Sequence, residues 1–439
     1  MNSFDPALII LIISVMSLLV LLLVRVPVGG ALLGIGILGV TYVQGFGKAI
    51  ALLKVTVYHF AASWALTSLP MYLMMGYFVY HMGIAEKLFN VARLLFHRIN
   101  GSLAIATAFG CAAFGSVSGS GFATTATFVK LALPEMKRDK YDRSLAVGVT
   151  TSSGGMGSLM PPSLLMILYA SLAEVPIAQC FIAGVFPCLL EALSFSTYIF
   201  VRCKLNPSLA PKSPRINVTP RLLLSAFISL WDVYIILAII FGGIYGGFVT
   251  ATEAGALSAF ATFAMGMVTR RLNWGKIKNS VVEALRVTGT ILIIALGAQL
   301  FVSFLTFAGV HEFIGNALSG TSRITFLLYI FILYLFLGML LDTVGMMFLT
   351  VPVLLPILPT VGVSPILFCI LFVKVAELGG ITPPVGMGVY LVNSMLKEEY
   401  SLGQIFKGCL PFAVSQSVNF WILVLFPSIA LFLPKLIYG

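Results

Sequence analysis

The sequence contains few charged residues. Asp, Glu, Lys and Arg make up 9% of its 439 residues, whereas hydrophobic residues make up 59%. Soluble globular domains carry about 25% charged residues, so this composition excludes an ordinary soluble domain. Apolar runs of about twenty residues recur along the whole chain, and an α-helix needs this length to span a bilayer. The composition therefore predicts an all-α, polytopic membrane protein.

Signatures of several other classes are missing as well. A membrane β-barrel needs alternating strands of about ten residues, which the long apolar runs do not provide. The cysteines show no CxxC spacing and no neighbouring histidines, which excludes a disulfide framework and a zinc site, so we expect them to be packing residues. They are Cys111, Cys180, Cys188, Cys203, Cys369 and Cys409. The N-terminal stretch MNSFDPALIILIISVMSLLVLLLVR lacks a basic start and a cleavage motif, which favours a retained first span.

The net charge of +11 comes mainly from Lys and Arg gathered in short connectors. Such clusters orient a membrane protein by the positive-inside rule, and we therefore expect no nucleic-acid partner. By the same rule, five connectors should lie on the cytoplasmic side: Lys87 to Arg98, Lys137 to Arg143, Arg202 to Arg221, Arg270 to Arg286, and Lys397 to Lys407.

Two segments are too polar at their centres to face lipid. Residues 99–136 lie between two basic connectors and contain the stretch GSVSGSGFATTAT, so they should enter and leave the membrane on one side. Residues 324–360 contain a similar stretch, and the alternation of the intervening spans places their ends on the opposite side. We predict two re-entrant helical hairpins that are inserted from opposite faces.

An internal repeat relates these two segments. The chain has two Pro-Pro dipeptides, at 161–162 and 383–384, and each lies 27 residues after a Leu-Pro at Pro134 or Pro356. The offset is 222 residues in both cases, and it aligns Ser120 of the first hairpin with Asp342 of the second. Inverted repeats of this kind, each with a hairpin and a Gly/Pro-broken helix, are typical of secondary transporters with a site at the bilayer midplane.

These features predict four regions. They are N-terminal scaffold spans at 1–60, a first inverted repeat at 61–221 with a hairpin at about 99–136, scaffold spans and a cytoplasmic connector at 222–286, and a second inverted repeat at 287–439 with a hairpin at about 324–360.

The broken helices suggest how such a site would bind ions. Serines and glycines in the first hairpin could serve only close helix packing. However, successive prolines remove backbone donors and free the carbonyl oxygens upstream. Free carbonyls and serine hydroxyls are ligands for a hard cation such as sodium, and the N-terminus of a half-helix attracts an anion.

The second repeat carries charged residues in apolar surroundings. An intramembrane carboxylate such as Asp342 costs roughly 3 kcal/mol, so we expect a functional role, with a shallow interfacial position as the alternative. Lys374 and Glu377 are spaced to neutralise each other on one helix face, for structure or for function. Between the repeats, Thr250 and Glu253 predict an N-cap and an acidic first turn.

Taken in this order and spacing, the motifs resemble the large membrane subunit of TRAP transporters, the tripartite ATP-independent periplasmic carriers of bacteria and archaea. The resemblance covers most of the chain. It is carried by LPMYLMMGYFVYHMGIAEKLF (69–89), GSVSGSGFATTA (115–126), LPEMKRDKYDRSLAVGVTTSSGGMGSLMPPS (133–163), FIAGVFP (181–187), GGIYGGFVTATEAGA (242–256) and ELGGITPPVGMGVY (377–390).

This resemblance implies the ion-transporter-superfamily fold and an elevator mechanism, with coupling to two or more sodium ions and no organic cofactor. It implies import of a small carboxylate or sulfonate across the bacterial inner membrane. The expected partners are a periplasmic substrate-binding protein and a small four-helix membrane subunit. Because the extra N-terminal helices of fused relatives are missing here, we expect the small subunit to be a separate polypeptide.

The resemblance also implies site residues. One sodium site would use Ser116, Ser118, Gly157, Met160 and Pro162. The other would use Thr252, Gly379, Thr382 and Pro384. The substrate would lie between the hairpin tips, near Ser120, Thr124, Thr125, Asp342 and Gly386. Many family members carry Asn where this chain has Gly388, so a polar side-chain contact is not expected there.

Three alternatives remain at this level. A stand-alone sodium- or proton-coupled anion permease of the same fold would need no binding protein. An intramembrane hydrolase would need HExxH or a Ser–His pair, which the four histidines do not form. A passive channel would not explain a paired, inverted constellation. We therefore expect a transporter and not an enzyme.

Overall fold

The computed structural model describes residues 5–211, 218–318, 320–397 and 399–439, and its regular elements there are helices. Part of the predicted connector from Arg202 to Arg221 lies outside the described residues. The helices are α1 (Pro6–Leu23), α2 (Val28–Gln44), α3 (Phe46–Ala61), α4 (Trp64–His81), α5 (Ile84–Phe96), α6 (Ser102–Ser118), α7 (Gly121–Arg138), α8 (Arg143–Ser153), α9 (Met156–Leu159), α10 (Leu164–Ala173), α11 (Ile177–Leu205), η1 (Pro207–Leu209), α12 (Pro220–Ile228), α13 (Trp231–Leu237), η2 (Ala238–Gly242), α14 (Gly243–Tyr245), α15 (Ala251–Val268), α16 (Trp274–Phe307), α17 (Val310–Leu318), α18 (Arg323–Leu340), α19 (Thr343–Leu354), η3 (Leu355–Ile357), α20 (Pro365–Gly380), α21 (Met387–Met395), α22 (Leu402–Leu425) and α23 (Ser428–Tyr438).

Several of these helices can cross a membrane. Within the described residues, five are long and apolar enough to do so, or up to eight if each bent pair counts as one span. Helices are favoured here because a bilayer offers the backbone no hydrogen-bond partners, so each segment must satisfy its own N–H and C=O groups. The predicted fold class, an all-α polytopic membrane protein, is confirmed.

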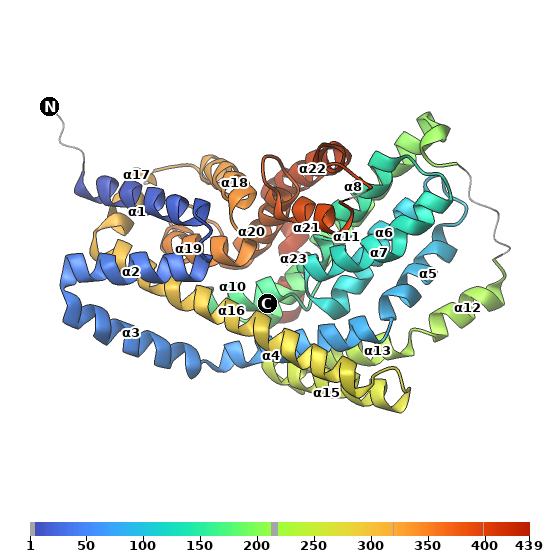
Figure 1. Ribbon diagram of the computed structural model, residues 1–439, viewed down its shortest axis with the longest axis horizontal. Coiled ribbons are helices and arrows are strands. Elements are labelled where there is room, and N and C mark those ends of the chain that lie inside the picture. Colours follow the sequence, from blue (N-terminus) through green and yellow to red (C-terminus); the bar gives the residue numbers. More distant parts are fainter. Residues whose placement is uncertain (1–4, 212–217, 319, 398) are drawn as a thin grey trace.

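The long helix α16 runs across the molecule and packs along α2 (Figure 1). Glycines allow the two backbones to touch: a Cβ added at Gly36 would lie 2.7 Å from the Phe301 nitrogen, and one at Gly297 would lie 2.5 Å from the Gly29 oxygen. Small residues at such contacts are the usual means of helix association in membranes. Helices α4 and α15 form a second closely packed pair.

Two helical hairpins are present at the predicted places. Helices α6 and α7 turn at Gly119, and helices α18 and α19 turn at Leu341 and Asp342. The Ser120 hydroxyl caps α7 by accepting from the Ala123 N–H, and the Asp342 carboxylate caps α19 by accepting from the Gly345 N–H. The two caps stand at the 222-residue offset of the repeat, so the aligned polar residues have the same local role.

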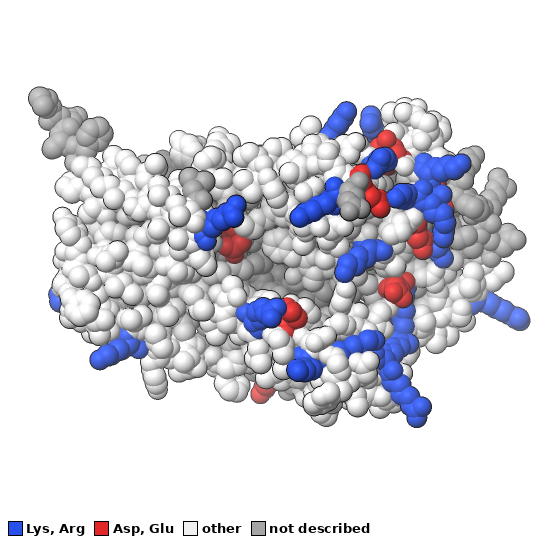
Figure 2. All heavy atoms as spheres, viewed as in Figure 1, with Lys and Arg blue, Asp and Glu red and all other residues white. Residues whose placement is uncertain are grey.

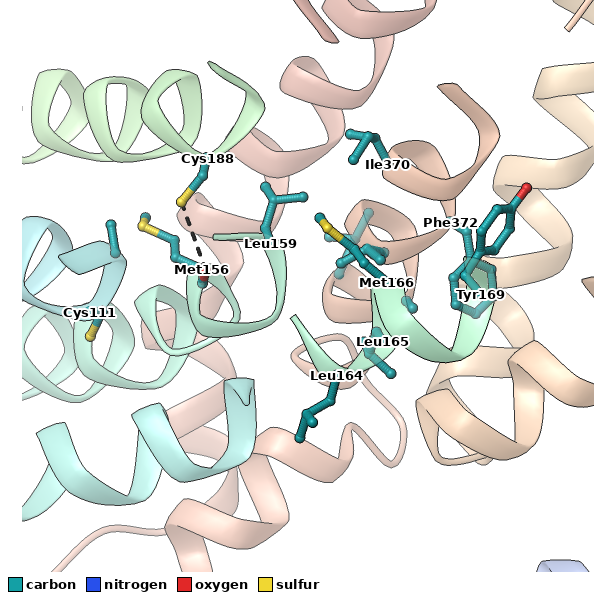
Figure 3. Close-up of a cluster of buried hydrophobic side chains, with 14 of the residues drawn as sticks. Cys111, Met156, Leu159, Leu164, Leu165, Met166, Tyr169, Cys188, Ile370 and Phe372 are labelled. Carbon is teal, nitrogen blue, oxygen red and sulfur yellow. Dashed lines mark hydrogen bonds between the residues drawn. The ribbon is translucent and has the colours of Figure 1, made fainter. Parts of the chain in front are cut away.

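Each hairpin is followed by a broken helix. The first consists of α8 and α9, a break at Met160–Ser163, and α10, with a bend of 42°. The second consists of α20, a break at 381–386, and α21. Both Pro-Pro peptide bonds are cis. Side chains around the first break lie in one buried apolar cluster with residues of α11 and α20, among them Met156, Met166, Cys188 and Ile370 (Figure 3).

All six cysteines are free and buried, which confirms that they are packing residues. Thr250 caps α15 in a reciprocal capping box with Glu253, as predicted.

Charged side chains are unevenly distributed. On the face drawn in Figure 2, Lys and Arg gather over the half of the molecule that contains α5, α6 and α7, and few lie over α1, α2 and α3. Beneath the surface, Asp232 of α13 is fully buried and pairs with Lys87 of α5 and, at 3.0 Å, with Arg271 beyond α15. This ion pair cluster joins three parts of the chain.

We expect Asp232→Asn to lower the stability of the folded protein by about 2 kcal/mol, because it leaves two partly buried cations without a counter-charge. Thermal unfolding in detergent would measure the effect. The matched control is Glu283→Gln, which breaks the exposed Arg286–Glu283 pair and should cost about 0.3 kcal/mol. Equal shifts for the two variants would contradict the structural role of Asp232.

Candidate functional site: a cavity between the two repeats

The two hairpin tips and the two broken helices enclose one small cavity, with about 20 Å³ of free volume. The first repeat and the second repeat both contribute to its wall. The lining residues of the first are Gly121, Phe122, Thr125, Thr151, Ser152 and Gly155; those of the second are Gly338, Leu341, Asp342, Thr343, Ala376, Glu377, Gly380, Ile381, Met387 and Gly388.

Glycine contacts hold each hairpin against its own broken helix. A Cβ at Gly115 of α6 would lie 2.8 Å from the Gly157 Cα, and a Cβ at Gly379 of α20 would lie 2.7 Å from the Gly338 Cα. Because backbone meets backbone at both places, any side chain larger than hydrogen must displace the hairpin. The same arrangement therefore recurs in both repeats.

Only some of the predicted substrate residues line the cavity. Thr125 and Asp342 line the cavity. Ser120 and Gly386 are the N-cap residues of α7 and α21, adjacent to lining residues. Thr124 lies on the other side of α7, where its hydroxyl is 3.1 Å from that of Ser118. Thr124 therefore belongs with the residues that were predicted for the first sodium site.

The structure brings the residues of the first predicted sodium site together at the tip of the first hairpin. A Cβ at Gly119 would lie 2.6 Å from the Pro162 carbonyl oxygen, and a Cβ at Gly115 would lie 3.3 Å from the Met160 Cβ. A Cβ at Gly157 would lie 2.2 Å from the Thr124 hydroxyl. The Pro162 carbonyl oxygen therefore lies directly against Gly119, and the Thr124 hydroxyl lies directly against Gly157.

Hydrogen bonds leave acceptor capacity on these hydroxyls. Ser116 donates to the Ala113 oxygen at 2.7 Å, and Thr124 donates to the Ser120 oxygen at 2.8 Å. Since the Thr124 proton is used there, Ser118 donates to Thr124. A hydroxyl that donates one hydrogen bond still has lone pairs for a cation. This set of oxygen atoms therefore fits sodium, a hard cation.

The second predicted sodium site is assembled only in part. Gly379, Thr382 and Pro384 belong to one broken helix, in which the Thr382 hydroxyl donates to the Leu378 oxygen at 2.6 Å. Thr252 stands in the first turn of α15, a helix that packs on α4 and α13. No hydrogen bond within the described parts of the chain joins Thr252 to the other three residues. Its participation stays a prediction.

The expectation that Lys374 and Glu377 neutralise each other is wrong. Lys374 forms its ion pair with Glu191 of α11, and both side chains are at most 3% exposed. The Gln416 amide of α22 donates to the same carboxylate at 2.8 Å. The pairing fails because Lys374 extends toward α11 and α22, whereas Glu377 points toward the first repeat.

Glu377 of the second repeat contacts the first repeat at Gly121 and Gly155. The Gly121 N–H at the start of α7 donates to the Ser158 hydroxyl at 2.9 Å. The Ser158 hydroxyl also lies close to the Glu377 carboxylate, because a Cβ added at Gly121 would be 2.7 Å from Ser158 Oγ. A Cβ at Gly121 or at Gly155 would lie 3.1 or 2.9 Å from a Glu377 carboxylate oxygen. This carboxylate of α20 therefore rests directly on the first hairpin and on the first broken helix.

Some cavity residues were not identified from the sequence. Thr151 and Ser152 lie on α8 and look like ordinary small helix residues, and Phe122 and Met387 look like lipid-facing or core residues. The polar run TTSSGG at 150–155, next to the Pro-Pro break, is a signal that could have indicated them.

We expect Ser118→Ala to raise the sodium concentration that gives half-maximal uptake at least tenfold, because the loss of one oxygen that binds the ion costs about 1.5 kcal/mol or more. Initial uptake rates as a function of sodium concentration would measure this. Ser14→Ala in α1 is a matched control, since that hydroxyl only donates to the Ile10 oxygen of its own helix. Unchanged sodium dependence in Ser118→Ala would exclude Ser118 as a ligand.

Comparisons with known proteins agree with this architecture. Residues 15–429 match the family model of the Tripartite ATP-independent periplasmic transporter, DctM component. The C4-dicarboxylate TRAP transporter large permease protein DctM of Pseudomonas aeruginosa is 30% identical over 386 residues, which cover 87% of this chain and 89% of that protein. The ectoine/5-hydroxyectoine TRAP transporter large permease protein UehC of Ruegeria pomeroyi is 29% identical over 381 residues, which cover 85% and 87% of the two chains.

A solved structure shares the fold at low sequence identity. The YdaH transporter of Alcanivorax borkumensis, which was reported to have an unusual topology, aligns with a TM-score of 0.61 and 14% identity over 87% of this chain and 88% of that chain. The family match, the two hairpins and the shared cavity lead to one conclusion: this chain belongs to the DctM family, the large membrane subunits of TRAP transporters.

Proposed function

We propose that the chain is the permease subunit of a sodium-coupled transporter that imports a small organic acid, a carboxylate or a sulfonate. The observation that carries this proposal is the convergence of two hairpin tips and two broken helices on one cavity. In secondary transporters such breaks present helix ends and free carbonyls to substrate and ions at the midplane.

Sodium would be held at the first site by the oxygens of Ser116 and Ser118 with the backbone at Gly157, Met160 and Pro162. At the second site the candidates are the backbone and hydroxyl oxygens of Gly379, Thr382 and Pro384, together with Thr252. The bound ion would supply positive charge beside the hairpin tip. The residues of the chain would position the hairpin tip so that it closes when these oxygens bind the ion.

An elevator movement would bring the cavity to each face of the membrane. Two features support it. The cavity has room for about one water molecule, so a substrate can enter only after the tips separate. In addition, α5 joins α4 to the first hairpin between two glycines in the left-handed region, Gly83 and Gly101, and such residues tolerate changes in backbone direction.

We further propose that a periplasmic substrate-binding protein delivers the substrate and that a small four-helix membrane subunit accompanies this chain in the bacterial inner membrane. Relatives support this assignment: the isethionate TRAP transporter permease protein DctMQ of Oleidesulfovibrio alaskensis is 29% identical, and this chain matches 58% of its length. The part of that protein outside the match leaves room for a fused small subunit.

Reconstitution tests this function. The chain and its small subunit are placed in proteoliposomes, and uptake of a radiolabelled organic acid is measured with and without the binding protein and with and without an inward sodium gradient. We expect uptake only when the binding protein and the inward sodium gradient are both supplied. Sodium-driven uptake that needs no binding protein would instead identify a stand-alone permease, and conduction without any gradient would identify a channel.

A further inference from the structure

The cavity between the repeats has acidic side chains and lacks basic ones. Asp342 and Glu377 both line it, and the described lining includes no Lys, Arg or His. A carboxylate or sulfonate placed there meets two acidic side chains and no basic one, and repulsion between like charges is strong in a site that is shielded from water. The side chains of the lining therefore favour a substrate that carries a cationic group over one that is purely anionic.

The two carboxylates are not equivalent. Asp342 is used as a helix cap: it accepts from the Gly345 N–H at 2.9 Å, and its charge is compensated by the N-terminal end of α19. Glu377 lies in the last turn of α20, and its carboxylate lies beside Gly121 at the start of α7, but the Gly121 N–H donates to Ser158 and not to this carboxylate. The Glu377 carboxylate lies beside Ser158 and makes no ion pair within the described residues.

The charges around Glu377 do not balance it. The nearby cation, Lys374, is bound to Glu191 and therefore does not pair with Glu377. Asp342 adds a further acid at the same cavity. Glu377 is thus a carboxylate without a counter-charge, and it faces the space between the hairpin tips.

The same cavity offers donors for an acid group. Helix α21 has no side-chain cap at its N-terminus, and its first residues, Met387 and Gly388, line the cavity. Within the described chain their N–H groups make no hydrogen bond. The Ser152 hydroxyl, 1% exposed, also lines the cavity and has no partner at hydrogen-bond distance there, although the Cys409 thiol is its neighbour.

We propose that the substrate is a zwitterion, an organic acid that also carries a cationic nitrogen. This proposal rests on the transport function proposed above and narrows its substrate class. The acid group binds the free N–H groups of α21 and the Ser152 hydroxyl. The cationic nitrogen binds Glu377, which supplies the missing half of an ion pair. Compounds of this class include amino acids, betaines and cyclic amidinium acids such as ectoine.

Binding to the purified complex of this chain and its small subunit tests the proposal. The probes are ectoine, glycine betaine and a set of amino acids as zwitterions, with succinate and isethionate as anions, in saturating sodium. Thermal stabilisation of the complex is measured as a function of probe concentration. We expect at least one zwitterion to stabilise the complex at lower concentration than either anion does.

The variant Glu377→Gln separates the charge effect from shape. It should weaken binding of the preferred zwitterion about 10- to 100-fold, the usual effect of losing one charged partner, and leave binding of succinate unchanged or tighter. The matched control is Glu312→Gln on the exposed side of α17, which should change the binding of neither the zwitterion nor succinate. Gly388→Ala should weaken the binding of zwitterions and of anions alike. The added Cβ would lie 3.1 Å from the Gly380 oxygen, next to the free N–H groups that bind the acid group.

Three results would overturn the proposal: stronger stabilisation by succinate or isethionate than by every zwitterion, no stabilisation by any zwitterion, or an unchanged ratio of zwitterion to anion affinity in Glu377→Gln. These results leave the transport function standing if sodium- and binding-protein-dependent uptake of an anion is still observed. Failure of all such uptake would instead refute the transport function.

Discussion

Replacing Lys374 with alanine should destabilise the protein by about 3 to 5 kcal/mol, the usual cost of leaving one buried charge without its partner. Lys374 and Glu191 are 2% and 3% exposed, and they join α20 of the second repeat to α11 of the first. Truncation leaves Glu191 with the Gln416 amide as its remaining partner. The measurement is the apparent melting temperature in detergent, together with the yield of folded protein in the membrane.

Two further variants show whether charge or packing causes the loss. Glu191→Gln alone should be as harmful as Lys374→Ala, because it leaves the lysine unpaired. The double variant Glu191→Gln with Lys374→Met removes both charges and retains an acceptor for Gln416, so it should recover most of the stability. Glu377→Gln is the comparison within α20 and should leave the melting temperature nearly unchanged.

The opposite pattern is equally informative. If Glu377→Gln destabilised the protein as much as Lys374→Ala, and Glu191→Gln did not, the lysine would be paired with Glu377 as its spacing in the sequence suggests. The distinction matters for the site, because a Glu377 that is neutralised by Lys374 would leave no carboxylate for a cationic nitrogen.

The repeat and its polar turns could be predicted because they depend on local chemistry. Proline removes a backbone donor wherever it occurs, so the Pro-Pro dipeptides marked the helix breaks. Ser120 and Asp342 are good N-cap residues, and both caps are found at the predicted offset. The Thr250–Glu253 capping box likewise depends on residues three apart.

Pairings between distant segments could not be predicted in this way. Lys374 is three residues from Glu377 and 183 from Glu191, and only the packing of α20 against α11 decides which carboxylate it reaches. The Ser158 hydroxyl lies beside Glu377 for the same reason. Ser152 and Thr151 enter the cavity because α8 lies against α7 and α22, an arrangement that periodicity alone does not give.

Gly157→Ala should lower the initial rate of coupled uptake at least 100-fold. The added Cβ would lie 2.2 Å from the Thr124 hydroxyl and 2.8 Å from the Ser120 carbonyl oxygen, closer than carbon and oxygen can approach. The hydroxyl can rotate away, but the carbonyl belongs to the backbone of the hairpin tip. The tip must therefore shift, and it carries both Ser118 and the start of α7.

A shift of a few tenths of an ångström matters because ligand oxygens must hold a small cation at nearly fixed distances. Gly157→Ala should also raise the sodium concentration that gives half-maximal rate, whereas the amount of protein in the membrane should stay close to wild type. Gly289→Ala in α16 is the matched control, since a Cβ there meets nothing within 4 Å. If Gly157→Ala transported with normal sodium dependence, the close packing of the hairpin tip on the broken helix would have no part in ion binding, and the first sodium site would have to lie elsewhere.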